Sequence, residues 1–280
     1  MTIEKVSDIL KEADHKGYAV PAFNVFNYES IAWLIEAAEE ESSPVIAMLY
    51  PPTDHIYNSS FTALTKDLAA KVETPVGLHF DHSRSFSEIM EGIKAGFTSV
   101  MIDGSSLSFE DNIELTKQVV QVAHPLDIDV EAELGFVGSA GREEDFRNKD
   151  LYTDPDRARE FIERTEVDSL AVAVGSAHGN YVSEPDLDLN RLAKINEKVN
   201  VPLVLHGGSG IPEPQLKEAV QRGINKVNIG TELNQHFFKI VKKKAVNKKG
   251  QGSMLGCLGE AREEIKQYFK YKIRLLKNKQ

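Results

Sequence analysis

Eight short apolar runs, rich in β-branched and aromatic residues, recur along the 280-residue chain and alternate with stretches of helical periodicity. The expected strands cover residues 19–24, 44–50, 75–82, 99–103, 129–135, 169–178, 202–208 and 226–231. Stretches such as ESIAWLIEAAEEE and PDRAREFIERT lie between them, and several end in Gly or His, as helix C-termini often do. Alternation of strand and helix throughout the chain predicts a parallel sheet.

Eight such units favour closure of the sheet into a (β/α)8 barrel. The alternative is an open doubly wound sheet, but the Gly-rich dinucleotide turn after its first strand is missing, because AFNVFNYES follows instead. No Pro/Gly/Ser linker divides the chain. We therefore expect one α/β domain over residues 1–280, a TIM barrel with extra N-terminal and C-terminal helices, the latter an extension over about residues 232–280.

The charge balance restricts the partners. The chain has 33 basic and 43 acidic residues, and its net charge of -10 repels nucleic acid and anionic lipid at long range. A single cysteine, Cys257, excludes an internal disulfide framework and fits a reducing compartment. The start of the chain lacks the features of a signal peptide, and no run of 18 apolar residues occurs. We expect a cytoplasmic protein that binds neither nucleic acid nor membranes.

Polar side chains gather at the C-terminal ends of the expected strands. They are Asn24, Asp81, His82, Asp103, Glu131, Glu133, Ser176, His178, His206, Asn228 and Thr231. In a barrel these ends converge on one rim, which is where barrel enzymes place their chemistry. The long polar connection GFVGSAGREEDFRNKDLYTD between the fifth and sixth strands is typical of a mobile active-site loop.

Three of these polar residues are histidines from separate strands, His82, His178 and His206. Three imidazoles with one open position are a common ligand set for catalytic zinc. Each histidine alone could equally cap a strand or bond within the core, but all three at strand ends favour a metal site. Zinc would polarise a carbonyl or stabilise an enolate. Asp81, beside a ligand, could then transfer a proton or orient an imidazole.

Two Gly-containing turns, HGGSGIP and NIGTE, follow the seventh and eighth strands, where barrels often bind phosphate through backbone N–H groups. Gly207, Gly208 and Ser209 would let the backbone approach an anion closely, although a tight turn alone would use the same residues. A Schiff-base enzyme would need a lysine inside the mouth, and Lys226 is expected at the start of its strand, at the opposite end of the barrel.

The motifs DHS, MIDGSS, EAELG, GSAHGNY, LVLHGGSGIP and KVNIGTE, in this order between about residues 3 and 240, resemble the zinc-dependent class II ketose-bisphosphate aldolases, the fructose- and tagatose-bisphosphate aldolase family. The resemblance implies a barrel enzyme that cleaves a ketose 1,6-bisphosphate to dihydroxyacetone phosphate and glyceraldehyde 3-phosphate, with zinc stabilising the enediolate. It also implies a homodimer or larger homo-oligomer, with EAREEIKQYFKYKIRLL as the candidate interface.

The resemblance assigns roles to individual residues. His82, His178 and His206 would bind zinc, and Asp81 would give a proton to the aldehyde-derived oxygen. Asp103 and Glu133 match positions that hold a second metal in some members, and Glu133 otherwise orients a ligand histidine; a monovalent cation is also open. Glu143 or Glu144, on the mobile loop, matches the residue that moves the C3 proton. The expected substrate-binding residues are Asn24, Gly179, Gly207, Gly208, Ser209, Asn228, Ile229, Gly230 and Thr231.

Some positions depart from the family pattern and leave the substrate open. Gly230 resembles the small residue of the tagatose-type branch. SML, residues 253–255, stands where many members have Asp-Pro-Arg, whose Arg reaches a partner subunit's second phosphate, and LYPPTDHI differs from the expected small-residue loop. The alternatives are an aldolase for a ketose monophosphate or a deoxy-keto acid phosphate, and a non-catalytic metal-dependent sugar-phosphate binder. Asp81 and the glutamate pair argue for an enzyme.

Overall fold

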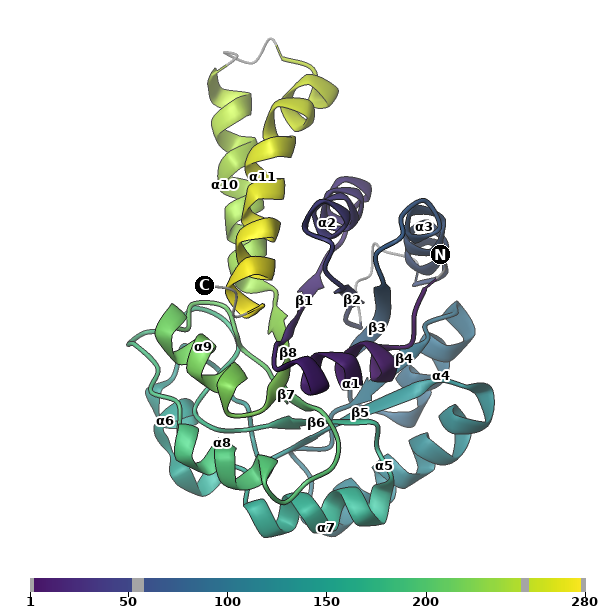
Figure 1. The fold of residues 1–280 in the computed structure, drawn as a ribbon, viewed down its shortest axis with the longest axis vertical. Helices are drawn as coiled ribbons and strands as arrows, with labels where there is room; N and C mark the ends of the chain where they lie inside the picture. Colours follow the sequence, from purple (N-terminus) through teal and green to yellow (C-terminus); the bar gives the residue numbers. More distant parts are fainter. Residues whose placement is uncertain (1–2, 52–57, 248–251, 278–280) are drawn as a thin grey trace.

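The computed structural model describes residues 3–51, 58–247 and 252–277, and its centre is a closed barrel of eight parallel strands in chain order (Figure 1). The strands are β1 Val20–Asn24, β2 Val45–Leu49, β3 Val76–Ser83, β4 Ser99–Ile102, β5 Asp129–Leu134, β6 Ser169–Val172, β7 Leu203–Leu205 and β8 Ile224–Ile229. The last strand pairs with the first, from Val20 opposite Lys226 to Phe23 opposite Ile229, and this pairing closes the sheet. The predicted (β/α)8 barrel is confirmed.

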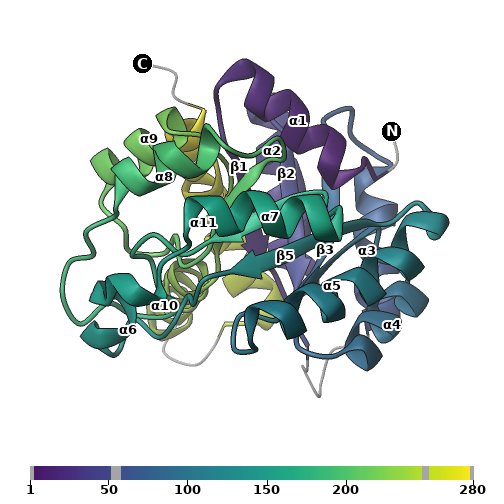
Figure 2. The same cartoon turned by 90° about the horizontal axis from the view of Figure 1, so that it is seen from below.

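Helices surround the barrel, and Figure 2 shows α5 and α7 side by side outside the sheet. The outer helices are α2 Tyr28–Glu41, α3 Asn58–Ala69, α4 Phe86–Ala95, α5 Phe109–Ala123, α6 Glu143–Arg147, α7 Pro155–Thr165, α8 Leu189–Asn196 and α9 Glu213–Gln221. β6 and β7 end well before the predicted residues 178 and 208, at Val172 and Leu205. The extended backbone is interrupted beyond them because Gly175 and Gly207 adopt left-handed φ values of 107° and 66°.

The predicted N-terminal helix, α1 Val6–Lys16, closes the amino end of the barrel. Its apolar face joins a core cluster with the inward-facing side chains of β1 and β2: Val6, Ile9, Leu10, Ala13, Val20, Ala22, Ile46 and Met48. Asp129, at the start of β5, accepts hydrogen bonds from the Ser7 N–H and hydroxyl at 2.8 and 2.9 Å. These bonds supply a partner for an otherwise unpaired N–H of the first helical turn.

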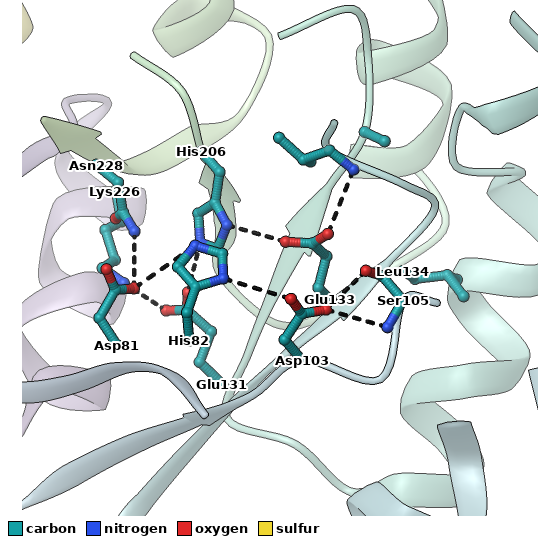
Figure 3. Close-up of polar contacts among 12 residues, drawn as sticks. Asp81, His82, Asp103, Ser105, Glu131, Glu133, Leu134, His206, Lys226 and Asn228 are labelled. Carbon is teal, nitrogen blue, oxygen red and sulfur yellow. Dashed lines mark hydrogen bonds and ion pairs between the residues drawn. The ribbon is translucent and has the colours of Figure 1, made fainter. Parts of the chain in front are cut away.

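A buried ion pair crosses the barrel interior. Lys226 and Glu131 are 0 and 1% exposed, and the Lys226 Nζ lies 2.7 Å from Glu131 Oε2 (Figure 3). The sequence placed Glu131 at a strand end and Lys226 at a strand start, and both placements are wrong. β8 begins two residues earlier than predicted, at Ile224, and Glu131 is only the third of the six residues of β5, so both side chains lie in the middle of the barrel.

The C-terminal extension is a hairpin of α10 Thr231–Asn247 and α11 Met254–Leu276, which projects from the barrel in Figure 1. α11 packs against α2, where Arg262 pairs with Glu36 at 2.7 Å. It also packs against β1, where the ring of Phe269 meets that of Phe23 edge to face, with ring centroids 4.9 Å apart. Met254 and Leu255, at the outer start of α11, are 80 and 82% exposed. Among the helices described, none is long and apolar enough to cross a membrane.

Replacement of Lys226 by Met should lower the free energy of unfolding by about 3–5 kcal/mol, because the buried Glu131 would lose its ammonium partner and keep only His206, which it shares with Glu133. The measurement is a urea midpoint at pH 7 with an unchanged m value. The control is Arg222→Met, which removes an exposed pair with Glu218 at 3.1 Å and should cost less than about 1 kcal/mol. Equal losses in the two variants would contradict a special role for the buried pair.

Candidate active site at the barrel mouth

His82 reaches the mouth because β3 is irregular at its carboxyl end. Successive strand residues point to opposite faces, so a regular strand could not turn both Asp81 and His82 into one pocket. Phe80 pairs with Val100 but Ser83 pairs with Ile102, which leaves one extra residue on β3. His82 also has a left-handed φ of 53°. This is the geometry of a β-bulge, a device that re-aims side chains beside active sites.

The three histidines come together as predicted. One ring nitrogen from each of His82, His178 and His206 lies within 4.8 Å of the others. His178 Nε2 is buried and has no hydrogen-bond partner in the described part of the chain, so a metal ion would satisfy it. Burial, together with His82 and His206, lowers the pKa of His178 to about 3. Its imidazole is therefore neutral, which is the form that binds metals.

His206 is held by two glutamates from β5. Its Nδ1 lies 3.0 Å from Glu133 Oε2, and its Nε2 lies 3.0 Å from Glu131 Oε1 (Figure 3). Burial alone would lower the pKa of His206, but the two carboxylates outweigh it and raise the pKa to about 10. To bind a metal, this imidazole must release one of the two glutamates. Glu133 thus contacts a candidate ligand histidine directly, which fits an orienting role.

Asp81 is clamped between two amides. Asn24 Nδ2 donates to Asp81 Oδ2 at 3.0 Å, and Asn228 Nδ2 donates to Oδ1 at 3.2 Å. Burial alone would raise the pKa of Asp81, but His82 and Lys226 outweigh it and lower the pKa to about 2. Gly230 leaves room for this arrangement, since a Cβ there would lie 2.7 Å from Asn24 Oδ1. Asp81 is therefore an oriented, ionised carboxylate beside the histidines.

Asp103 is the other acid beside His82. Its Oδ2 lies 3.6 Å from His82 Nδ1, while its Oδ1 accepts the Ser105 hydroxyl at 2.6 Å and the Ser105 N–H at 3.1 Å. Burial opposes ionisation, but hydrogen bonds from His82 and Ser105 lower the pKa of Asp103. Asp103 thus supports the imidazole of His82 in this structure, and Ser105, which belongs to the MIDGSS motif, holds Asp103 in a role that the motif alone did not assign.

Two cavities meet at His82 and His178. The inner cavity has a volume of about 200 Å³, and the outer one has about 820 Å³; both are lined by Tyr50, His82 and His178. The predicted residues that line the inner cavity are Asn24, Asp81, His82, His178, Gly179, Gly207, Ser209, Asn228, Gly230 and Thr231. Gly208 instead packs beneath Val227, where a Cβ would lie 2.4 Å from that side chain, and Ile229 belongs to the apolar core.

The turn after β7 depends on contacts that the sequence did not reveal. A Cβ at Gly207 would lie 2.2 Å from the Ala177 carbonyl oxygen, so only glycine fits. The Tyr181 hydroxyl accepts from the Ala177 N–H at 2.8 Å and donates to the Gly207 carbonyl at 3.0 Å. Tyr181 therefore joins the loop after β6 to the turn after β7. Tyr181 is the last residue of the GSAHGNY motif, but the motif alone does not indicate this contact.

The long loop after β5 is docked on the site. The His178 N–H donates to Gly138 O and the Ala140 N–H donates to His178 O, both at 2.8 Å. Glu143 and Glu144 nevertheless remain exposed, and neither lines the inner or the outer cavity. Glu143 instead pairs with Arg147 at 3.3 Å and accepts from the Ser183 hydroxyl. The structure does not bring these two predicted proton-transfer residues to the histidines.

Comparisons with known proteins agree with this geometry. Residues 4–280 match the family model described as fructose-bisphosphate aldolase class-II. The structure of the YdjI aldolase from Escherichia coli K12 is similar, with a TM-score of 0.86 and 39% identity over 99% of this chain and 97% of that one. The structure of a candidate fructose-1,6-bisphosphate aldolase from Coccidioides immitis has a TM-score of 0.87 and 29% identity, over 97% of this chain and 96% of that one. The fructose-bisphosphate aldolase from Campylobacter jejuni, at 24% identity and a TM-score of 0.81 over 98% and 95%, shares the fold. The chain belongs to the class II fructose-bisphosphate aldolase family.

Proposed function

We propose that this aldolase cleaves a ketose 1,6-bisphosphate of the fructose or tagatose type to dihydroxyacetone phosphate and glyceraldehyde 3-phosphate. The observation that carries the proposal is the position of His82 and His178 at the junction of two cavities, within reach of the buried His206 and beside the ionised Asp81. A ketose bound there would have its reacting carbons at the histidines and one part of its chain in each cavity. Cleavage between the two parts would then release two separate products.

Zinc is the proposed metal, and His82, His178 and His206 would hold it, since the orphaned nitrogen of His178 and the all-imidazole donor set fit this ion. When bound, zinc supplies a Lewis acid that polarises a carbonyl and favours loss of a neighbouring proton. Asp103 and Glu133 remain candidates for a second divalent metal or a monovalent cation. Their contacts with His82 and His206 favour an orienting role for both.

Asp81 is the proposed base for bond cleavage. Its low pKa keeps it ionised at neutral pH, so it can accept the proton of the substrate hydroxyl as the carbon–carbon bond breaks. In the condensation direction the same oxygen returns the proton to the aldehyde-derived oxygen. Asn24 and Asn228 bind one carboxylate oxygen each, and these bonds fix the orientation of the carboxylate from which the proton is transferred. Glu143 or Glu144 would move the C3 proton after a rearrangement of the loop after β5.

The inner cavity is the proposed site for the dihydroxyacetone phosphate part. Gly179, Gly207 and Ser209 line it, and α10 begins at Thr231 on its wall. Backbone N–H groups of such turns and of helix N-termini bind phosphate well. This local set of donors would offset the long-range repulsion between a phosphate and a chain of net charge -10.

A ketose monophosphate or a deoxy-keto acid phosphate is the second candidate substrate. It is favoured by one observation: residues 253–255 lie at the outer start of α11, where Ser253 caps the helix and Met254 and Leu255 carry no charge for a second phosphate. Most of the LYPPTDHI segment, residues 52–56, lies outside the described residues. A non-catalytic binder is less well supported, because it would not need the two amides that hold Asp81.

The segment EAREEIKQYFKYKIRLL, predicted as the interface, buries its apolar side chains within the subunit, as Ile265 and Phe269 do. The proposed interface of a homodimer or a larger homo-oligomer is therefore the outer part of the hairpin of α10 and α11. Phe238, Met254 and Leu255 are 70, 80 and 82% exposed on it, an apolar surface of the kind that self-association covers. The free thiol of Cys257 supports a reducing compartment, the cytoplasm, as the proposed location.

The proposed reaction can be tested with three substrates. Fructose 1,6-bisphosphate, tagatose 1,6-bisphosphate and fructose 1-phosphate are incubated with the enzyme before EDTA treatment, after it, and after zinc is added back. We expect release of dihydroxyacetone phosphate that EDTA abolishes and zinc restores, with the highest rate on one bisphosphate. Restored cleavage of fructose 1-phosphate alone would establish the monophosphate alternative. Absence of any cleavage by folded, zinc-loaded protein would contradict the aldolase substrates proposed.

Replacement of His206 by Ala should remove bound metal and activity together. We expect zinc affinity to fall more than about 100-fold, because loss of an outer-shell partner alone costs about 10- to 100-fold. Metal content after dialysis against a competing chelator is the measurement. His236→Ala is the matched control, since His236 stacks on Tyr268 with ring centroids 4.6 Å apart, and it should keep metal and turnover. Metal retained by the His206 variant would refute the ligand assignment.

Replacement of Asp81 by Ala should leave the metal bound but lower kcat by about 100- to 10,000-fold, the usual contribution of a positioned acid or base. Steady-state cleavage rates and metal content, measured on the same sample, test this. Because the pKa of Asp81 is lowered to about 2, protonation inactivates it only near that pH. The wild-type profile should therefore show no Asp81 transition between about pH 5 and 9. Turnover unchanged in the variant would return Asp81 to a structural role.

A further inference from the structure

The outer cavity is much larger than the inner one, at about 820 against 200 Å³, and the proposed function assigns it the aldehyde half of the substrate. Its volume lies within the range of about 300–1,000 Å³ that holds drug-sized ligands. A three-carbon aldehyde would leave much of it empty. The chemistry of its walls therefore bears on which aldehyde this enzyme accepts.

Two arginines line this cavity. Arg84 comes directly after the DHS motif, on the connection between β3 and α4. Arg142 lies on the long loop after β5. The Arg142 guanidinium already pairs with Asp145 at 2.8 Å. The Arg84 guanidinium is exposed and makes no hydrogen bond or ion pair with residues 3–51, 58–247 or 252–277; only its backbone N–H is bonded, to Glu88 Oε2 at 2.6 Å.

The acids on the same walls are already engaged. Glu88 accepts the backbone N–H of Arg84, and Asp103 is bonded to Ser105 and faces His82. They do not pair with the Arg84 side chain. An unpaired guanidinium in a cavity of an acidic protein is a specific attraction for an anion, because its planar fork binds phosphate or carboxylate through two parallel hydrogen bonds.

We propose that the outer cavity selects aldehydes that end in an anionic group, and that Arg84 is the residue that binds this group. The inference rests on the proposed function and adds a specificity-determining residue within the same subunit. Arg142 adds positive charge to the cavity but is partly neutralised by Asp145. Phosphate and carboxylate share the chemistry that Arg84 recognises, and the cavity volume admits chains longer than three carbons.

The test uses the condensation direction with dihydroxyacetone phosphate held constant and two matched pairs of aldehydes. Glyceraldehyde 3-phosphate is compared with glyceraldehyde, and succinic semialdehyde is compared with butanal. kcat/KM is measured for the metal-loaded wild type and for Arg84→Gln, Arg84→Lys and Arg159→Gln. Arg159 is the control because it is an exposed arginine on α7 that lines neither cavity of the site.

We expect the wild type to prefer at least one anionic aldehyde over its neutral match by about 10- to 100-fold, the value of a charge-assisted hydrogen-bonded contact. The comparison within the phosphate pair of aldehydes and within the carboxylate pair identifies which anion the cavity binds. Arg84→Gln should remove this preference and leave the neutral aldehydes within about twofold of wild type. Arg84→Lys should keep part of the preference, since it retains charge but not the fork. Arg159→Gln should change nothing.

Exchange of the C3 proton of dihydroxyacetone phosphate with D2O separates this inference from the proposed function, because it needs no aldehyde. Normal exchange in the wild type and in Arg84→Gln, with no anion preference in either, would overturn the inference and leave the function standing. Equal loss of activity on charged and neutral aldehydes in Arg84→Gln would also overturn it. No exchange in the wild type would refute the function, and the inference with it.

Discussion

The pairing of Lys226 with Glu131 in the centre of the barrel is the interaction on which the active site rests. An ammonium group that is 0% exposed is tolerated only beside a carboxylate, so the registers of β5 and β8 must bring the two together. The other oxygen of Glu131 faces His206 Nε2 at 3.0 Å. A requirement of the folded interior, the neutralisation of a buried charge, thereby fixes the position of one candidate metal ligand.

The same charges govern the ionisation of Asp81, the proposed base. Lys226 and His82 both lower the pKa of Asp81 against the effect of its burial, so the carboxylate stays ionised where an isolated buried acid would take up a proton. The amides of Asn24 and Asn228 then set its orientation. Asp81 is kept ionised by the charged groups of the interior, and its carboxylate is oriented by the two neutral amides. These two properties together suit the base proposed for an aldol cleavage.

The sequence predicted the barrel and the three histidines because both follow from local patterns: the alternation of strand and helix, and polar residues at strand ends that parallel topology must bring to one rim. It misplaced Lys226 because periodicity did not fix the start of β8, and it misplaced Glu131 because a polar residue in the middle of β5 was taken for one at its end. The bulge at His82 and the bridge made by Tyr181 depend on contacts with other strands and loops. No sequence pattern indicates a binding role for Arg84, because an exposed arginine on a loop is common in any protein.

The two cavities are lined by different parts of the fold, and this difference affects how the enzyme could distinguish substrates. The inner wall consists largely of strand ends and glycine turns, including Gly207, whose backbone is wedged against Ala177, so it is set by the barrel itself. The outer wall is formed by side chains of the loops after β3, β4 and β5, such as Arg84, Ser106 and Arg142. Loop side chains can be replaced without disturbing the strands that carry the histidines. Under the proposed assignment of the two cavities, recognition of the ketone half is therefore tied to the fold, whereas recognition of the aldehyde half depends on loop side chains that can be replaced.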